Sequence, residues 1–504
     1  MKSIRRILIA NRGEIAVRII RTCKEMGLET IAVYSEADKR SLHAQIADES
    51  YLLGAAPAAQ SYLDMDKIIS IARQTRCDAI HPGYGFLSEN AEFAEAVSRE
   101  GITFVGPPSS AIRAMGDKPR ARELARKAGV PVVPGIDRAT ERDEDIIRAA
   151  RDLGYPALVK ASAGGGGKGM RIVRSEADLS SAVRAARSEA QSAFGDDRVY
   201  LEKYLKNPRH IEFQVLADVH GNIIHLGERE CSIQRRHQKI IEESPSVHLS
   251  QLLRASMAKA AVLVARSCGY VNAGTIEFLL DQDSNFYFLE VNTRLQVEHT
   301  VTEMVTGIDM VREQLRIAQG ERLSLTQEEL LSRGHAIECR IYAEDPFNSF
   351  FPSMGKITRL RPALGPGVRE DCGVEEGSEI TVHYDPLISK LISWSETRRG
   401  AIARMKRALQ EYQLSGVETT IPFCLYVMDH PDFQAGRYDT FFVENHFQAD
   451  SLKLDDRLSL IAAVTSACVA ELKKKMASTV LPAANGRAQS KWKSKRLDMS
   501  DWIE

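Results

Sequence analysis

Short apolar runs alternate with amphipathic segments near the start of the chain. Residues 4–10 (IRRILIA) contain an apolar run that predicts a buried strand, and a turn follows at NRG. Residues 14–26 (EIAVRIIRTCKEM) have apolar side chains at helical spacing, Gly27 ends this helix, and residues 30–34 (TIAVY) predict a second strand. This order predicts a parallel sheet flanked by helices over about the first 115 residues.

A glycine-rich stretch lies between two strand-like segments in the middle of the chain. Residues 156–162 (PALVKAS) and 170–175 (MRIVRS) predict antiparallel strands, and AGGGGKG joins them. A Walker A loop requires a hydroxyl after Lys168, but Gly169 stands there. The dinucleotide fingerprint G-x-G-x-x-G is met, but a glycine run meets it by chance, and its context of strand then helix is missing. A flap over phosphates and a plain hairpin turn both remain open.

A second predicted hairpin carries acidic side chains. Residues 274–292 (GTIEFLLDQDSNFYFLEVN) are two strands around a polar turn centred on Asp283–Ser284. In that register Glu277 lies opposite Glu290, about 5 Å away, and Asn292 points to the same face. Two carboxylates and an amide that converge suit Mg²⁺ ions carrying phosphate oxygens. A solvated hairpin face is the alternative, and the register assumes that no bulge interrupts it.

Charged side chains follow and precede this hairpin. The segment TRLQVEHT (293–300) places Arg294, Gln296 and Glu298 at alternating positions beside the proposed metals. An arginine there can hold an anion or stabilise transferred charge, and a glutamate can act as a base. Residues 228–243 gather five cationic side chains among carboxylates: Arg229, Arg235, Arg236, His237 and Lys239. Taken alone, that run fits a solvated surface equally well.

The later part of the chain is rich in short strands and turns up to about Phe447. Residues 335–344 (HAIECRIYAE) predict a strand with an apolar and a polar face. The apolar face has Ile337, Cys339 and Ile341, and the polar face has Glu338, Arg340 and Tyr342.

The C-terminal extension predicts an amphipathic helix. It begins near Asp455–Asp456 and ends at Lys473–Lys475. Its apolar positions recur at three- and four-residue spacing: Leu458, Ile461, Thr465, Cys468 and Leu472. The helix either docks a partner subunit or packs on its own C-terminal domain. Beyond Pro482 the segment is polar and basic, and we expect it to be disordered until a partner binds.

Composition narrows the class of protein. The 504 residues are 44% hydrophobic and 27% charged with a formal net charge of −1, so there is no basic excess for nucleic acid. The chain has no apolar stretch of membrane-spanning length, and ILIA is too short for a signal-peptide core. The eight cysteines are scattered without a C-x-x-C pair, so we expect free thiols in a reducing cytoplasm rather than a zinc site.

Several motifs together resemble the biotin carboxylase family of ATP-grasp enzymes. They are IANRGEIAVRI, HPGYGFLSEN, KASAGGGGKGMRIV, EKYLKNPRHIEFQV, RECSIQRRHQKIIEESP and FLEVNTRLQVEHTVTEMVTG. Ala163 departs from many members, which have glycine there. The resemblance implies an α/β and α+β architecture with a Rossmann-like N-terminal domain (1–117) and an ATP-grasp domain (118–330, with a mobile lid at about 131–205). A β-rich C-terminal domain (331–447) and an extension (448–504) would follow.

The resemblance also implies an activity. Bicarbonate and ATP would carboxylate biotin by way of carboxyphosphate, with two Mg²⁺ or Mn²⁺ ions. The biotin would sit on a separate biotin carboxyl carrier protein, a carboxyltransferase subunit would take the carboxyl group onward, and the chain would form a homodimer. Neither nucleic acid nor membrane would be a partner.

Site residues carry over by motif position. Those for the nucleotide would be Lys118, Lys160, Gly166, Gly167, Glu202, Lys203, Leu205, His210, Gln234, His237 and Leu279. The metals would lie at Glu277, Glu290 and Asn292. Bicarbonate would lie among Lys239, Arg294, Gln296 and Val297, with Glu298 as its base. Arg340 would stabilise the biotin oxyanion, and Tyr84 and Gly85 would help seat biotin.

Three alternatives are weighed against this assignment. The large subunit of carbamoyl-phosphate synthetase duplicates the whole unit in about twice this length, whereas one copy is present here. Carboxyphosphate-forming purine enzymes are shorter and would not need the RRHQK run. A non-catalytic nucleotide scaffold would have no reason to retain buried like charges. The nearest string to a biotinylated A-M-K-M hairpin is KKKMAS (473–478), which lies on a helical pattern, so we expect a separate biotin carrier protein and a separate carboxyltransferase. The final carboxyl acceptor stays open, because that choice belongs to the carboxyltransferase.

Overall fold

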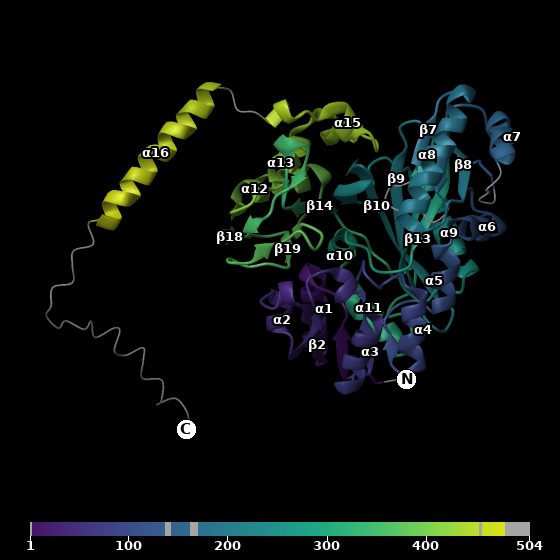
Figure 1. Cartoon of the computed structure of the whole chain (residues 1–504), viewed down its shortest axis with the longest axis horizontal. Coiled ribbons are helices and arrows are strands. Elements are labelled where there is room, and N and C mark those ends of the chain that lie inside the picture. The colour runs from purple at the N-terminus through teal and green to yellow at the C-terminus, as the bar shows by residue number, and fades with distance from the viewer. Residues whose placement is uncertain (1–2, 137–142, 162–169, 453–455, 479–504) are drawn as a thin grey trace. The chain divides into compact units, whose positions relative to one another are not determined.

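The computed structural model describes residues 3–136, 143–161, 170–452 and 456–478 of the chain. It divides into two units, Met1–Ala449 and Asp450–Glu504, which are described separately (Figure 1). The glycine run with Gly166 and Gly167 and the segment beyond Pro482 lie outside the described residues. The domain limits 1–117, 118–330, 331–447 and 448–504, and the mobility of 131–205, stay predictions.

The N-terminal region is the predicted parallel sheet, in the order β3-β2-β1-β4-β5. The strand–helix–strand unit is confirmed as β1 (Arg6–Ile9), α1 (Gly13–Glu25) and β2 (Glu29–Ser35). Helix α1 ends there because Gly27 adopts a φ of 71°, which glycine tolerates. The other elements of the region are β3 (Glu49–Gly54), β4 (Ala79–His81), β5 (Thr103–Phe104), α2 (Leu42–Ile46), α3 (Met65–Gln74), α4 (Ala91–Arg99) and α5 (Ser109–Gly116).

A small antiparallel sheet follows, in the order β7-β6-β8. The strands predicted on both sides of the glycine run are confirmed as β6 (Ala157–Ala161) and β7 (Met170–Val173), and Lys160 pairs with Met170. Strand β8 (Val199–Lys203) completes the sheet. Helices α7 (Asp143–Leu153) and α8 (Glu176–Phe194) pack on it and share its apolar core.

An eight-stranded sheet runs through the rest of the first unit, in the order β13-β12-β9-β10-β11-β14-β21-β19. Its strands are β9 (Arg209–Ala217), β10 (Ile223–Arg235), β11 (Gln238–Ser244), β12 (Asn272–Leu280), β13 (Phe286–Asn292), β14 (His335–Tyr342), β19 (Val368–Cys372) and β21 (Leu387–Ser395). Helices that border it include α6 (Lys118–Lys127), α9 (Gln251–Ser267), α10 (His299–Thr306) and α11 (Met310–Ala318). Because β11 pairs with β14, one sheet connects the predicted ATP-grasp and C-terminal domains.

The register of the β12–β13 hairpin is as predicted at the site but not at the turn. Glu277 pairs with Glu290, whereas Leu280 pairs with Phe286, so the turn is centred on Asp283 alone. A β-bulge at Leu289, between the pairs Glu277–Glu290 and Phe278–Phe288, absorbs the difference. The assumption of an unbroken register was therefore wrong, and the two departures cancel where the acidic side chains meet.

The C-terminal region confirms the two predicted faces of β14. Ile337, Cys339 and Ile341 lie in an apolar core with helix α12 (Arg398–Glu411), while the opposite face meets charged groups. The remaining helices are α13 (Ile421–Asp429), α14 (Pro431–Gln434) and α15 (Phe442–His446). Three short strand pairs complete it: β15 (Glu344–Asp345) with β16 (Phe351–Pro352), β17 (Gly355–Lys356) with β20 (Glu379–Ile380), and β18 (Arg359–Arg361) with β22 (Gln413–Ser415).

The second unit contains the helix predicted for the C-terminal extension, α16 (Asp456–Ser478). It begins where predicted and runs three residues past Lys475. Several of its apolar side chains are exposed: Leu460, Ile461, Val464, Val469 and Leu472. Docking of a partner subunit on this helix and packing of the helix on its own C-terminal domain both stay predictions. Across the described part of the chain, no helix is both long and apolar enough to span a bilayer.

The hairpin that carries the acidic residues depends on an aromatic cluster. Phe278 is fully buried, with ring centroids 6.2 Å from Phe213 and 5.6 Å from Phe286. We expect Phe278→Ala to lower the free energy of unfolding by about 3–5 kcal/mol, because it leaves a cavity in this core. Urea denaturation followed by tryptophan fluorescence measures the loss. Phe286→Ala, at a half-buried ring, is the control, and equal losses in both variants would contradict this packing.

Candidate active site

A cleft of about 650 Å³ lies along the central strands of the first unit. Strands β6, β8, β9, β12, β13 and β14, the β10–β11 turn and residues 440–444 line it. It brings together the predicted residues Lys118, Lys160, Glu202, Lys203, Leu205, His210, Gln234, His237, Lys239, Glu277, Leu279, Glu290, Asn292, Arg294, Gln296, Val297 and Arg340. Glu298 lies behind this lining in contact with Lys239, while Tyr84 and Gly85 are not part of it.

One end of the cleft combines apolar walls with a buried carboxylate. Leu158, Leu205 and Leu279 offer apolar surface for a planar ring. Glu202 is buried, and its carboxylate meets the Nζ of Lys160 at 2.5 Å and the guanidinium of Arg122. Burial acts to raise the pKa of Glu202, but these two cations outweigh it and lower the pKa below the usual range.

Sequence reasoning missed Arg122, which is itself buried and donates from Nη2 to the carbonyl of Val133 at 2.7 Å. It lies on helix α6 in an ordinary charged run, KPRARELARK, where nothing distinguishes it from its exposed neighbours. Only the contact with Glu202, far along the chain, reveals its place.

The acidic hairpin forms the opposite end of the cleft. Glu277 accepts from the Nδ2 of Asn292 at 2.7 Å and from the Nε2 of Gln296 at 2.9 Å, and His210 lies 2.8 Å from it. Glu290 is half-exposed, and Lys118 lies 3.5 Å away. Burial acts to raise the pKa of Glu277, but Lys239 and His210 hold it well below its usual range. The ionised carboxylate of Glu277, with further oxygen donors beside it, fits a hard divalent cation such as Mg²⁺.

Lys239 is the centre of the charged cluster. Its Nζ donates to Glu277 and Glu298, both at 2.8 Å, and to Glu212. Arg229, with no exposed surface, binds the other side of Glu212. Sequence reasoning missed Glu212 as well, although it pairs with Glu277 across the β9–β12 ladder and shares its face.

Two arginines complete the cluster around Glu298. Arg340 donates from Nη2 to Glu298 at 2.9 Å, and its Nε lies 2.7 Å from Glu242, an acid that sequence reasoning also missed. Arg294 donates to Asn292 at 2.9 Å and Gln296 at 2.6 Å. Burial acts to raise the pKa of Glu298, but Lys239, Arg340 and Arg229 hold it well below the usual range. Cations therefore surround a carboxylate that stays ionised.

The charged run at 228–243 is not a solvated surface. Strands β10 and β11 are largely buried, and Arg229 and Lys239 project into the cluster. At the turn between them, Arg236 and His237 adopt φ values of 49° and 66° and line the cleft. The alternation of cations and acids is the pattern of buried ion pairs, which resembles a surface pattern until the partners are known.

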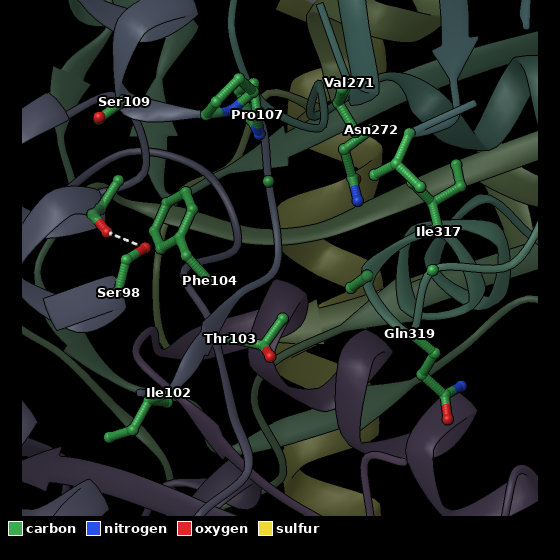
Figure 2. Close-up of a pocket in the computed structure, with 16 residues that line it drawn as sticks. Ser98, Ile102, Thr103, Phe104, Pro107, Ser109, Val271, Asn272, Ile317 and Gln319 are labelled. Carbon is green, nitrogen blue, oxygen red and sulfur yellow. Dashed lines mark hydrogen bonds between the residues drawn. The ribbon is translucent and has the colours of Figure 1, made fainter. Parts of the chain in front are cut away.

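A second cavity of about 480 Å³ lies elsewhere in the first unit (Figure 2). Its lining includes Ile102, Phe104, Val271 and Ile317, with Asn272 and other uncharged polar groups. Because no lining residue is charged, it is not suited to a nucleotide's phosphates. The charged cleft is the candidate active site.

The sequence and fold of this chain are similar to those of known proteins. Three family models match consecutive parts of the chain: "Biotin carboxylase, N-terminal domain" over residues 3–112, "Carbamoyl-phosphate synthase L chain, ATP binding domain" over 117–326 and "Biotin carboxylase C-terminal domain" over 338–445. A biotin carboxylase of Nostoc is 55% identical over 87% of this chain and 98% of its own. The chain belongs to the biotin carboxylase family.

Other relatives of the biotin carboxylase family agree. The crystal structure of biotin carboxylase from Campylobacter jejuni superposes with a TM-score of 0.86 at 49% identity, covering 88% of this chain and 99% of that one. The propionyl-CoA carboxylase alpha chain of Ruegeria pomeroyi is 47% identical over 97% of this chain and 75% of its own. That match reaches into the C-terminal extension, whereas the Nostoc biotin carboxylase covers 87% of the chain.

The chain is therefore an ATP-dependent ligase that carboxylates biotin with bicarbonate, the first half-reaction of biotin-dependent carboxylases. ATP, Mg²⁺ and biotin take part in this chemistry. The alternatives of a carbamoyl-phosphate synthetase, a shorter purine enzyme and a non-catalytic scaffold are set aside. The predicted ATP-grasp architecture, with a Rossmann-like N-terminal sheet and a β-rich C-terminal region, is confirmed.

The depressed pKa of Glu298 predicts a change in pH dependence. Lys239→Met removes a cation that lowers the pKa of Glu298. The pKa of Glu298 therefore rises, and a larger fraction of this carboxylate is protonated at a given acidic pH. We expect the acid limb of kcat/KM for bicarbonate to move up by about one pH unit or more. Lys118→Met, which removes a cation at the Glu290 end, should weaken ATP binding without moving that limb. If the acid limb of Lys239→Met lies at the same pH as that of the wild type, Lys239 does not lower the pKa of a base that bicarbonate turnover requires.

Proposed function

We propose that the charged cleft holds ATP and bicarbonate side by side and that its residues have the following roles. The observation that carries this proposal is the contact of Lys239 with Glu277 on one side and Glu298 on the other. This contact links Glu277, which is suited to metal and phosphate, with the cations around Glu298, which are suited to a small anion.

The nucleotide lies between the β7-β6-β8 sheet and the eight-stranded sheet. The adenine ring packs on Leu279, and Glu202, Lys203 and Leu205 read its edge. Lys118 and Lys160 contact the phosphates or the base from either side, and His210, Gln234 and His237 hold the ribose and phosphate end. Gly166 and Gly167 close over the phosphates, although they lie outside the described residues. Glu277, Glu290 and Asn292 would hold Mg²⁺ or Mn²⁺, and the ion would supply positive charge that neutralises the phosphates.

Bicarbonate binds between Lys239, Arg294 and the backbone of Gln296 and Val297, and Glu298 takes its proton. A carboxylate with a low pKa is a weak base, so this transfer requires that the same cations also stabilise the dianion that forms. The deprotonated oxygen then attacks the γ-phosphorus of ATP, ADP leaves, and carboxyphosphate forms. Lys239 offsets the repulsion between the two reacting anions.

Carboxyphosphate breaks down to CO₂ and phosphate in a site that must exclude water. The released phosphate takes the proton from the ureido nitrogen of biotin, and that nitrogen attacks CO₂. Arg340 stabilises the oxyanion that develops on the ureido oxygen. The backbone at Tyr84 and Gly85 seats the biotin ring. Carboxybiotin, ADP and phosphate are the products.

We further propose the partners. Biotin arrives on a separate carrier protein, a carboxyltransferase subunit receives the carboxyl group, and this chain forms a homodimer, as the biotin carboxylase domain of Hydrogenobacter thermophilus 2-oxoglutarate carboxylase does. An acyl-CoA is the favoured final acceptor, because the match to a propionyl-CoA carboxylase alpha chain extends into the C-terminal extension. The eight free thiols favour a reducing compartment, proposed to be the cytoplasm.

The role of Glu298 predicts a selective loss. We expect Glu298→Gln to lower bicarbonate-dependent ADP release by about 10²–10⁴-fold, because the amide cannot take a proton. ATP binding, measured by calorimetry, should stay within about twofold, since no nucleotide contact is removed. Glu290→Gln is the matched control and should weaken Mg²⁺-dependent ATP binding instead. Loss of ATP affinity in Glu298→Gln to the same extent would count against its role as base.

A further inference from the structure

Lys390 is a fully buried cation beside residues 293–298, the loop between β13 and α10. It lies on β21 with 0% exposed surface, and its Nζ donates to the backbone carbonyl of Val297 at 2.9 Å. The same Nζ lies 3.2 Å from a carboxylate oxygen of Glu14 on α1 and 3.8 Å from one of Asp371 on β19. Burying a lysine costs free energy unless each charge is paired, and here the pairing reaches three separate parts of the fold.

The contact with Val297 orients a peptide group of the proposed bicarbonate site. In a trans peptide the carbonyl and the following N–H point in opposite directions. Lys390 therefore directs the N–H of Glu298 away from itself by holding the Val297 carbonyl. The ring Nδ1 of His299 lies 2.7 Å from the carbonyl of Gln296 and fixes the N–H of Val297 in the same manner.

The other end of this network reaches the proposed biotin seat. The hydroxyl of Tyr84 donates to Glu14, whose second carboxylate oxygen faces Lys390. Asn11 donates from Nδ2 to the carbonyls of Tyr84 and Pro82, both at 2.7 Å, and so fixes the backbone of that loop. Tyr84, Glu14, Lys390 and Val297 thus form a continuous chain of polar contacts between two loops.

We propose that Lys390 is a positioning residue that couples the Tyr84 loop to the Val297 loop, so that the seats for biotin and bicarbonate are held in register. This inference rests on the proposed placement of the two substrates. Lys390 does not touch either of them. It acts through the Val297 carbonyl and the Glu14 carboxylate, and its loss lets the bicarbonate loop shift independently of the biotin loop.

Lys390→Met tests the proposal, because it keeps the length of the side chain and removes its charge. The KM for bicarbonate in ADP release should rise roughly tenfold or more, with the KM for ATP within about twofold of wild type. Stimulation by free biotin should fall as well. A merely structural defect would lower kcat and raise both KM values together. Lys406→Met, at a half-exposed ion pair with Asp429, is the control and should leave all three quantities unchanged.

A double-mutant cycle tests the coupling itself. Tyr84→Phe removes only the hydroxyl that binds Glu14 and should raise the KM for bicarbonate, although Tyr84 is distant from that seat in the network. In Tyr84→Phe/Lys390→Met the two effects should be less than additive, since both act through one chain of contacts. If Lys390→Met does not fold, Tyr84→Phe combined with Glu14→Gln serves as the cycle.

Three results would overturn the inference. They are an unchanged KM for bicarbonate in folded Lys390→Met, parallel rises in both KM values, and additive effects in whichever cycle is measured. Failure of the proposed function is distinguishable, because the wild-type protein would then show no bicarbonate-dependent ADP release.

Discussion

The placement of Lys239 among three buried carboxylates is the interaction on which the rest of the site depends. The Nζ of Lys239 contacts Glu212, Glu277 and Glu298. The surrounding cations hold the pKa of Glu277 and of Glu298 well below the usual range, whereas burial and the nearby Glu298 raise the pKa of Glu212. Lys239, Arg229 and Arg340 supply the positive charge: Arg229 and Lys239 lie on the consecutive strands β10 and β11, and Arg340 lies on β14, which pairs with β11 although it is far along the chain. The result is a preorganised electrostatic site that can accept a metal–phosphate group on one side and a small anion on the other.

The sheet topology makes this arrangement possible. Glu212 on β9, Lys239 on β11, Glu277 on β12 and Arg340 on β14 lie on strands of one eight-stranded sheet. Glu298 directly precedes α10, which packs on β10, β11 and β14. The cluster is therefore carried by regular strands and a helix of the described part of the chain, which holds its charges in fixed positions.

Local patterns predicted the elements well, because periodicity and turn residues act over a few positions. They predicted the β-α-β unit, the strands around the glycine run, both faces of β14 and the pairing of Glu277 with Glu290. The turn is centred on Asp283 rather than between Asp283 and Ser284, and a bulge at Leu289 compensates for this difference, so the predicted pairing is correct. The contacts between charged side chains could not be predicted from such local patterns. Arg122, Glu212, Glu242 and Lys390 are charged residues in ordinary-looking segments, and their burial follows from contacts between distant parts of the chain.

The central claim is that ATP cleavage in this cleft is coupled to bicarbonate and biotin, and ADP release measures it most directly. Purified protein is supplied with ATP, Mg²⁺, bicarbonate and free biotin, and each component is omitted in turn. We expect ADP release to fall to background without bicarbonate or Mg²⁺ and to fall strongly without biotin. ADP release that is unchanged when bicarbonate and biotin are both omitted would contradict it.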